Sequence, residues 1–380
     1  MTFWDDLTGQ ADAIQTLRAA ASADPANSSM THSWLITGPP GSGRSNLAYA
    51  FAGALLARGH DDEATARQVA ARSHPDLAVL STERIIITID EVRTLVASSQ
   101  FSPSVGRYRV VVIEDADRMT ERTSNLLLKA LEEPPPRTVW ILCAPSEADL
   151  IPTIRSRVRS VRLRVPSVDD VAELLIRRGV ERETAVVAAR EAQSHIGMAQ
   201  RLATDPEARG RRRRTLETAL AIRSVSDAVI AASTMLAVAG DDAKAITEER
   251  DAQERASALR SLGVEAGGTV PPALRSQLRA LEDDQKRRAT RSLRDGIDRI
   301  MVDLLSLYRD VLLLHLGVGH DLVNESIRSQ LEAARAASSP ATTLAVMDAV
   351  ALARRRIEAN VAPALALEAM LVAVSRHAVR

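Results

Sequence analysis

The feature that most constrains this chain is a glycine-rich stretch near the N-terminus. It matches the phosphate-binding P-loop pattern at every position but one, with arginine in place of lysine, over Gly38, Pro39, Pro40, Gly41, Ser42, Gly43, Arg44 and Ser45. The apolar run 34–37 precedes the stretch and a helical pattern over 46–52 follows it. Glycines let the loop amides turn toward an anion, and the helix start adds its positive dipole end. The sequence therefore predicts a nucleotide-binding fold.

Arg44 alters the chemistry that the loop can perform. A P-loop lysine places a compact ammonium between the terminal phosphates, whereas a guanidinium is bulky and planar and cannot fill the same volume. Ser45 can still present a hydroxyl to magnesium. An accidental glycine-rich turn is disfavoured by the flanking pattern. Two alternatives remain open, a working ATPase and a P-loop fold with weakened or lost catalysis.

Length and composition bound the rest of the chain. With 380 residues it is too long for one core, so two or three domains are expected. Its 49 acidic residues balance 49 lysines and arginines, and aromatics make up only 2 %. Such a chain lacks the charge and the stacking side chains for avid nucleic-acid binding by itself. Any DNA contact is expected to be shared with partners.

Compartment signals are sparse and consistent with one another. Cys143 is the single cysteine, so no intrachain disulfide can form, and its apolar surroundings predict a buried thiol. The N-terminus lacks the basic end and apolar segment of a signal peptide. The most apolar stretch, 311–316, is too short to span a bilayer. A cytoplasmic protein without membrane contact is therefore expected.

Alternating strand and helix patterns predict a doubly wound parallel sheet up to residue 165. The expected strands are 34–37, 77–80, 109–113, 138–143 and an edge strand 161–165, with an extended segment at 85–89. Helices are expected over 7–21, 46–58, 61–71, from Asp90 onward and over 125–133, where three prolines stop the last one. Glu114 and Asp115 follow the third strand, at the edge where a nucleotide's magnesium would sit.

Beyond Pro166 every long segment reads helical. The expected domains are 1–165 with the P-loop, a small helical lid at 166–207, and a helical domain at 208–380. Long helices are expected over 216–239, 242–262, 272–318 and 346–377, with a flexible elbow at 263–271. The run Arg211–Arg214 is interpreted as a solvated linker, with contact to phosphates or acidic partners as the alternative.

An ordered set of motifs resembles the AAA+ clamp-loader subunits of bacterial DNA polymerase III. The set comprises Gly9-Gln10, the P-loop, Ser73–Asp76, Asp90–Arg93, VVVIEDADRM, NLLLKALEEPP and IRSR, and it runs from the N-terminus to the end of the lid. The resemblance implies an AAA+ domain, a lid and a C-terminal collar for oligomerisation. It implies a role in loading the sliding clamp onto primer-template DNA, with tau/gamma and delta subunits as partners.

Three departures separate the chain from the hydrolysing subunits of that family. Arg44 replaces lysine, Glu114 and Asp115 stand in reversed order, and the segment from Cys143 to Ser146 offers no clear polar sensor. The expected protein requires no cofactor for its role and has no intrinsic ATPase, although ATP or ADP with magnesium could stay bound. The alternatives are a tau/gamma-like ATPase and an AAA+ adaptor of another oligomeric motor.

Ser156 and Arg157 match the serine-arginine pair of clamp loaders. The resemblance implies that Arg157 is an arginine finger reaching a neighbour's γ-phosphate, which can contribute roughly three to five orders of magnitude in rate. The alternative is an ordinary surface arginine. Arg201 is a weaker candidate for a lid sensor, since the register favours Gln200.

Two smaller expectations concern metals and helix pairs. The family commonly carries a four-cysteine zinc module, but 57–75 contains no cysteine, and the spacing of His60, Asp61, Asp62 and His74 matches no standard site. No metal site is therefore predicted. Lys129 and Glu132 are expected to pair on one helix face.

Overall fold

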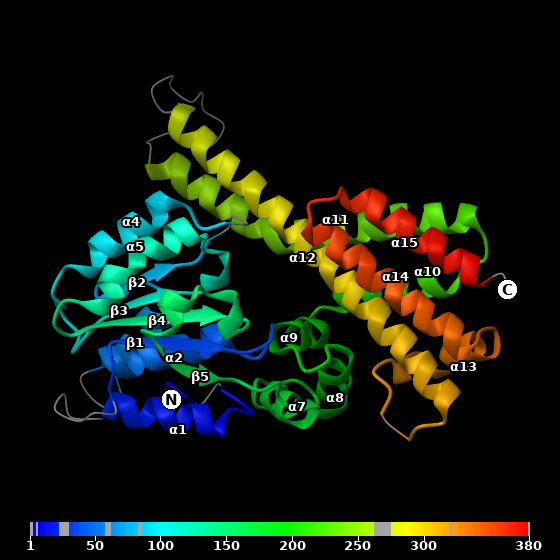
Figure 1. Cartoon of the computed structure of the whole chain (residues 1–380), viewed down its shortest axis with the longest axis horizontal. Helices are drawn as coiled ribbons and strands as arrows, with labels where there is room; N and C mark the ends of the chain where they lie inside the picture. The colour runs from blue at the N-terminus through cyan, green and yellow to red at the C-terminus, as the bar shows by residue number, and fades with distance from the viewer. Residues whose placement is uncertain are drawn as a thin grey trace. The chain divides into compact units, whose positions relative to one another are not determined.

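The computed structural model describes residues 3–4, 7–22, 30–57, 62–82, 86–261, 275–319 and 321–378. It divides the chain into two compact units, Met1–Thr204 and Asp205–Arg380. The first unit carries the P-loop and the sheet, and the second is entirely helical in its described part (Figure 1). The three-domain division at 165 and 207 stays a prediction.

The first unit is built on a five-stranded parallel sheet in the order β2-β3-β4-β1-β5. The strands are β1 Ser33–Thr37, β2 Leu77–Leu80, β3 Arg109–Ile113, β4 Thr138–Ala144 and β5 Arg159–Arg162. Every residue of β4 and β1 is buried, as expected for near-continuous apolar strands covered on both faces. The predicted parallel α/β fold is confirmed, with the P-loop strand β1 between β4 and β5.

Helices cover both faces of this sheet (Figure 1). On one face α1 Ala11–Ser22, α2 Arg44–Leu56 and α3 Glu63–Ala70 pack against inward side chains that include Trp34, Ile36 and Cys143. On the other, α4 Ile89–Ser99, α5 Glu121–Glu132 and α6 Pro152–Arg155 pack against Leu35, Trp140 and Leu142. Successive residues of β1 and β4 thus serve opposite cores, which fixes the register of the sheet.

Local sequence explains the ends of these elements. Thr88 and Glu91 form a capping box that starts α4, and Thr120 caps α5. The prolines after Glu133 end α5 as predicted. The edge strand is displaced, because β5 covers 159–162 instead of 161–165 and only the amide of Leu163 continues the ladder, to Thr37 O at 2.6 Å.

The expected extended segment at 85–89 is a shorter feature. Residues 83–85 lie outside the described residues, and Ile87 forms only an isolated parallel bridge with Met119. The helix that follows begins at Ile89, one residue earlier than expected, because its cap is Thr88.

The first unit ends in three short helices, α7 Val168–Arg177, α8 Arg182–Glu191 and α9 Ile196–Thr204. Ser167 caps α7 through a capping box with Asp170. Apolar residues from all three helices close a small core, with Leu175, Ala189 and Ala199 fully buried. The helices are joined to β5 by the short segment 163–167.

The second unit is a bundle around two long antiparallel helices, α11 Val225–Ser261 and α12 Arg275–Leu316 (Figure 1). Around them lie α10 Pro206–Leu220, α13 Arg328–Ala336, α14 Pro340–Glu358 and α15 Pro363–Ala378, with a shared apolar core. The far ends of α11 and α12 extend past the other helices of this unit. The predicted elbow at 263–271 lies outside the described residues.

Two helix boundaries were predicted wrongly in this unit. Helix α11 continues through Gly240 as one element, because a single glycine in a helix costs only about 1 kcal/mol and packing along α12 offsets it. The expected helix 346–377 is instead two helices. It breaks after Glu358, where Asn360 adopts a left-handed φ of 64° and Pro363 starts α15.

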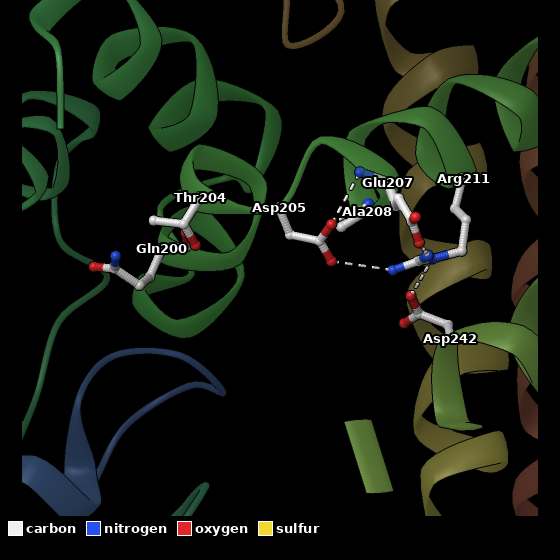
Figure 2. Close-up of polar contacts among 7 residues, drawn as sticks. All are labelled: Gln200, Thr204, Asp205, Glu207, Ala208, Arg211 and Asp242. Atoms are coloured by element: carbon white, nitrogen blue, oxygen red, sulfur yellow. Dashed lines mark hydrogen bonds and ion pairs between the residues drawn. The ribbon is translucent and has the colours of Figure 1, made fainter. Parts of the chain in front are cut away.

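The interpretation of Arg211–Arg214 as a solvated linker is wrong, because these residues lie within α10. Figure 2 shows Asp205 capping α10 through the amides of Glu207 and Ala208, at 2.9 and 3.1 Å. Arg211 binds Asp205 at 3.2 Å, Glu207 at 3.4 Å and Asp242 of α11 at 2.8 Å. The arginine therefore ties the start of α10 to α11.

Arg212 is more deeply buried than its neighbour. Its Nε donates to Asp303 of α12 at 3.0 Å, and Nη2 donates to the Asn324 side chain at 2.6 Å. Only 7 % of the Arg212 and Asp303 side chains is exposed. Asn324 in turn donates to Asp310 at 2.9 Å, so one polar network crosses the core of this unit. Arg213 and Arg214 point to solvent.

No single helix in the described ranges is long and apolar enough to cross a membrane, and only the pair 325–336 and 340–358, bent by 114°, meets the length and composition test jointly.

Candidate nucleotide site and arginine finger

The P-loop lies between β1 and α2, as the sequence predicted. Gly41 and Gly43 adopt left-handed φ values of 80° and 91°, which a side chain would strain. The amide of Gly38 donates to Pro145 O and that of Ser42 to Pro39 O, both at 3.2 Å. Two of the loop amides are therefore already bonded within the protein, although the turn itself has the shape of an anion cradle.

Arg44 is folded back onto its own loop. Its guanidinium Nη1 donates a short hydrogen bond to the carbonyl oxygen of Gly38. Ser45 follows in the first turn of α2, half-buried, while the buried hydroxyl of Ser42 has no hydrogen-bond partner among the described residues. The cation at the lysine position is thus engaged with the loop backbone.

The short helices after β5 pack directly against the P-loop. A Cβ added to Gly41 would lie 2.3 Å from Cγ of His195, and the amide of Ile196 donates to Gly41 O at 3.2 Å. At the start of the loop, a Cβ on Gly38 would lie 2.8 Å from Cβ of Leu163. Close packing at both ends explains why these two positions are glycine. His195 covers the P-loop at Gly41.

The acidic residues after β3 are engaged by other side chains. Glu114 accepts a hydrogen bond from the Tyr49 hydroxyl and forms an ion pair with Arg72 at 2.8 Å. The Arg72 guanidinium also lies 5.2 Å from the Tyr49 ring centroid, and burial followed by the Glu114 hydrogen bond raises the pKa of Tyr49. Asp115 pairs with Arg118 at 3.5 Å. Both carboxylates are therefore engaged by partners that lie outside the P-loop.

The segment at the end of β4 contains a buried thiol and a hydroxyl that caps a local turn. Cys143 is fully buried and burial raises its pKa to about 12, so the prediction of a buried thiol is confirmed. Ser146 accepts a hydrogen bond from the amide of Ala148 at 3.2 Å and caps a short 3₁₀ turn. Its hydroxyl is used for local structure.

A cavity of about 990 Å³ opens at the carboxyl ends of β1, β4 and β5, beside the P-loop. Its lining includes Gly38, Pro39, Ser146, Arg155 and Arg162. Among the described residues, Glu114 and Asp115 do not line it. The cavity thus contains the first two residues of the P-loop and neither of the two acids.

The candidate finger lies elsewhere in this unit. Arg157 follows α6, and its Nε donates to Glu132 at the end of α5 at 2.6 Å. Nη1 donates to Thr153 O at 2.7 Å and to Ser156 Oγ at 3.0 Å. A third of the Arg157 side chain remains exposed. The expected pair of Lys129 with Glu132 is absent among the described contacts, because Glu132 binds Arg157 instead.

Several expectations receive less from the structure. Arg201 lies on α9, half-buried, and its neighbour Gln200 accepts from Arg178 at 3.3 Å. His60 and Asp61 lie outside the described residues; Asp62 caps α3 and His74 is buried. Within the described ranges no three histidine, cysteine or acidic side chains gather as a metal site.

Sequence reasoning missed three residues that shape the site, Tyr49, Arg72 and His195, and it assigned Glu132 the wrong partner. Tyr49 and Arg72 are separated from Glu114 by more than one element, and only the folded sheet brings them to it. The signal for Glu132 was present, since an acid at a helix C-terminus is unfavourable without a cation beside it.

Strand order, P-loop and short helical subdomain together define an AAA+ P-loop unit. Residues 9–167 match the family described as DNA polymerase III, delta subunit. A DNA polymerase III subunit delta' of Pseudomonas aeruginosa is 37 % identical over 154 residues, 38 % of this chain and 47 % of that protein. The Escherichia coli subunit delta' is 32 % identical over 166 residues, 42 % of this chain and 50 % of that one.

Relatives of another name are similar to the chain at lower identity. The DNA polymerase III subunit tau of Bacillus subtilis is 30 % identical over 160 residues, 40 % of this chain and 28 % of that protein. The chain thus aligns with about half the length of the delta' relatives. Residues 9–167 are thus similar to the DNA polymerase III delta subunit family, and the chain is similar in sequence to delta' subunits.

Proposed function

We propose that the chain is a delta-prime-like subunit of the DNA polymerase III clamp loader, acting in the cytoplasm. In this proposal it is a stator whose own P-loop stays chemically idle, and it lends Arg157 to the ATP site of a neighbouring subunit. Its partners are tau/gamma and delta subunits, with the sliding clamp and primer-template DNA reached through the complex. The observation that carries the proposal is the engagement of Glu114 by Tyr49 and Arg72.

This engagement bears on hydrolysis directly. A P-loop ATPase needs an acid beside the strand end to hold magnesium and another to orient water. Only 13 % of the Glu114 side chain is exposed, and moving it toward the P-loop would leave a tyrosine hydroxyl and an arginine without their acceptor. Forming an ATPase site would also require Arg44 to leave the Gly38 carbonyl and His195 to move away from Gly41, and each step costs further free energy.

The first test is ATP hydrolysis by the purified, unpartnered chain. We expect no turnover above background, and no change in Ser45→Ala. Turnover by the isolated chain that disappears in Ser45→Ala would replace this proposal with a tau/gamma-like ATPase. That second candidate has one observation in its favour, the sequence similarity of the chain to tau and gamma subunits.

The second test concerns Arg157 in a reconstituted clamp loader. We expect Arg157→Ala to lower hydrolysis at the site that it serves by about three orders of magnitude, so that total ATP turnover falls by that site's share. Arg122→Ala is the control, because Arg122 is exposed on α5 and pairs with no acid among the described residues. Equal turnover in the two variants would remove the finger role.

Association and nucleotide binding complete the test. A pull-down with tau/gamma and delta subunits should retain the chain, whereas an adaptor of another motor would not be retained.

The P-loop amides remain available with arginine at position 44, so we propose that ATP or ADP binds weakly without hydrolysis. Equilibrium dialysis with ATP or ADP measures the dissociation constant of the nucleotide for the wild-type chain and for Arg44→Lys. We expect tighter binding in Arg44→Lys.

A further inference from the structure

Arg157 uses most of its hydrogen-bonding capacity inside its own subunit. A guanidinium has five N–H donors. Nε and Nη2 both face one oxygen of Glu132, with Nε at 2.6 Å, while Nη1 serves Thr153 O and Ser156 Oγ. A finger binds a phosphate through the same fork of donors. The arginine therefore cannot grip a neighbour's phosphate with this fork while Glu132 holds it.

Glu132 is held in place by the end of α5. Leu127 and Leu131 anchor this helix in the core below the sheet, and His32 bonds the carbonyl of Leu131 at 2.9 Å. Ile154 of α6, fully buried, packs in the same core, so the backbones that carry Glu132 and Arg157 are fixed relative to each other. Only the two side chains are free to separate.

The position of Glu132 is electrostatically costly without Arg157. It is the last residue of α5, where the helix dipole disfavours a negative charge. Lys129, one turn earlier, makes no ion pair with it among the described contacts, so Arg157 is the cation that compensates. The pair is also accessible, with 45 % of the Glu132 side chain and 32 % of the Arg157 side chain exposed.

We propose that Glu132 is a latch for the finger, a positioning residue that competes with the neighbour's γ-phosphate for the Arg157 fork. This inference rests on the finger role proposed above. In the free subunit Glu132 holds the guanidinium against α5. In the assembled site the more highly charged phosphate takes the same donors, and Glu132 returns to solvent. Because an exposed ion pair is weak, the latch releases readily.

The latch itself is tested on the whole chain without partners. Phenylglyoxal modifies accessible arginines, and mass spectrometry reports the rate at Arg157 relative to Arg155 in the same chain. We expect Glu132→Gln to raise that ratio about two- to fivefold, the range that an exposed pair of this kind can supply. Glu133→Gln is the control, an exposed neighbour with the same charge change. An unchanged ratio in Glu132→Gln overturns the latch.

A second measurement gives the sign of the effect on catalysis. In a reconstituted clamp loader at subsaturating ATP, Glu132→Gln should raise turnover above that of Glu133→Gln, because the finger is released more often. Turnover at or below the control overturns the competition. If Arg157→Ala leaves turnover unchanged, the finger role fails, and the modification ratio still decides whether Glu132 holds Arg157.

Discussion

The buried Arg212 gives the sharpest test of how the helical unit is held together. Replacing it with alanine removes hydrogen bonds to Asp303 and Asn324, of 3.0 and 2.6 Å, in a site where only 7 % of either charged side chain is exposed. Breaking a buried ion pair on one side costs about 3–5 kcal/mol, because the remaining charge stays desolvated. The cost here should lie near the lower end, since Arg299 is close enough for Asp303 to act on its pKa.

Arg299 therefore sets the expected magnitude. Burial lowers the pKa of Arg299 and the charge of the nearby Asp303 offsets part of this lowering, so a second positive charge stays near this carboxylate when Arg212 is removed. We expect Arg212→Ala to destabilise the helical unit by about 3 kcal/mol. For a unit of this size each kcal/mol shifts the midpoint by about 2–4 °C, which gives a drop of about 6–12 °C. Arg212→Lys should fall between, because it keeps the charge but loses the fork.

The two units can be followed separately in one sample. All three tryptophans, Trp4, Trp34 and Trp140, lie in the first unit, so tryptophan fluorescence reports that unit alone. Circular dichroism at 222 nm is dominated by helices and reports both. Unfolding of the second unit should appear in circular dichroism and not in tryptophan fluorescence. Arg212→Ala should lower the midpoint of that transition. The control is Arg213→Ala, which removes the next arginine, exposed on the same helix.

The reasoning would be refuted by equal dichroism midpoints in Arg212→Ala and Arg213→Ala. A loss that appears equally in fluorescence would also contradict it, since the network lies wholly in the second unit. Surface substitutions usually change stability by no more than about 0.5 kcal/mol, so the two arginines should differ by several times that amount.

Two further predictions concern the first unit. Burial raises the pKa of Asp76, but hydrogen bonds from Ser104, Gly106 and Val105 outweigh it and lower the pKa to about 2. The ionised carboxylate therefore contributes about 2 kcal/mol to the stability of the first unit, fully present above pH 4 and lost as pH falls toward 2. In Asp76→Asn, the unfolding midpoint followed by fluorescence should no longer depend on pH in this range. Gly41→Ala should destabilise the unit by about 1–3 kcal/mol, because its φ is left-handed and the new Cβ meets His195. Adding His195→Ala should restore part of that loss, and a Gly41→Ala midpoint equal to wild type would contradict the packing of α9 on the loop.

The parts of the fold that the sequence predicts are those fixed locally. The P-loop is a contiguous turn with its own glycines, and β3 and β4 are short apolar runs bounded by turn residues. Each of these signals lies within a dozen residues and needs no tertiary information. The positions of the two acids after β3 were predicted for the same reason, because the end of a buried strand fixes them.

The side-chain partners could not be predicted in this way. Glu114 is claimed by Tyr49 and Arg72, which come from α2 and from the turn after α3, and no spacing rule connects them. Arg211 and Arg212 read as a solvated charge run in sequence, yet each finds acids on α11 or α12 once the bundle forms. A run of like charges says nothing about which member will be buried, since that depends on the helix face that packing selects.

The contacts of three arginines in the first unit bear on the finger role that we propose for Arg157. Releasing Arg44 would leave the buried carbonyl of Gly38 unsatisfied, and releasing Arg72 would leave the Glu114 carboxylate, whose side chain is 13 % exposed, without its cation. Arg157 is bonded to a carboxylate that is 45 % exposed, which water can solvate when the pair opens. Opening that pair costs no more than about 1 kcal/mol, whereas an unsatisfied buried group costs about 1–3 kcal/mol. Among Arg44, Arg72 and Arg157, the proposed role in trans therefore costs least at Arg157.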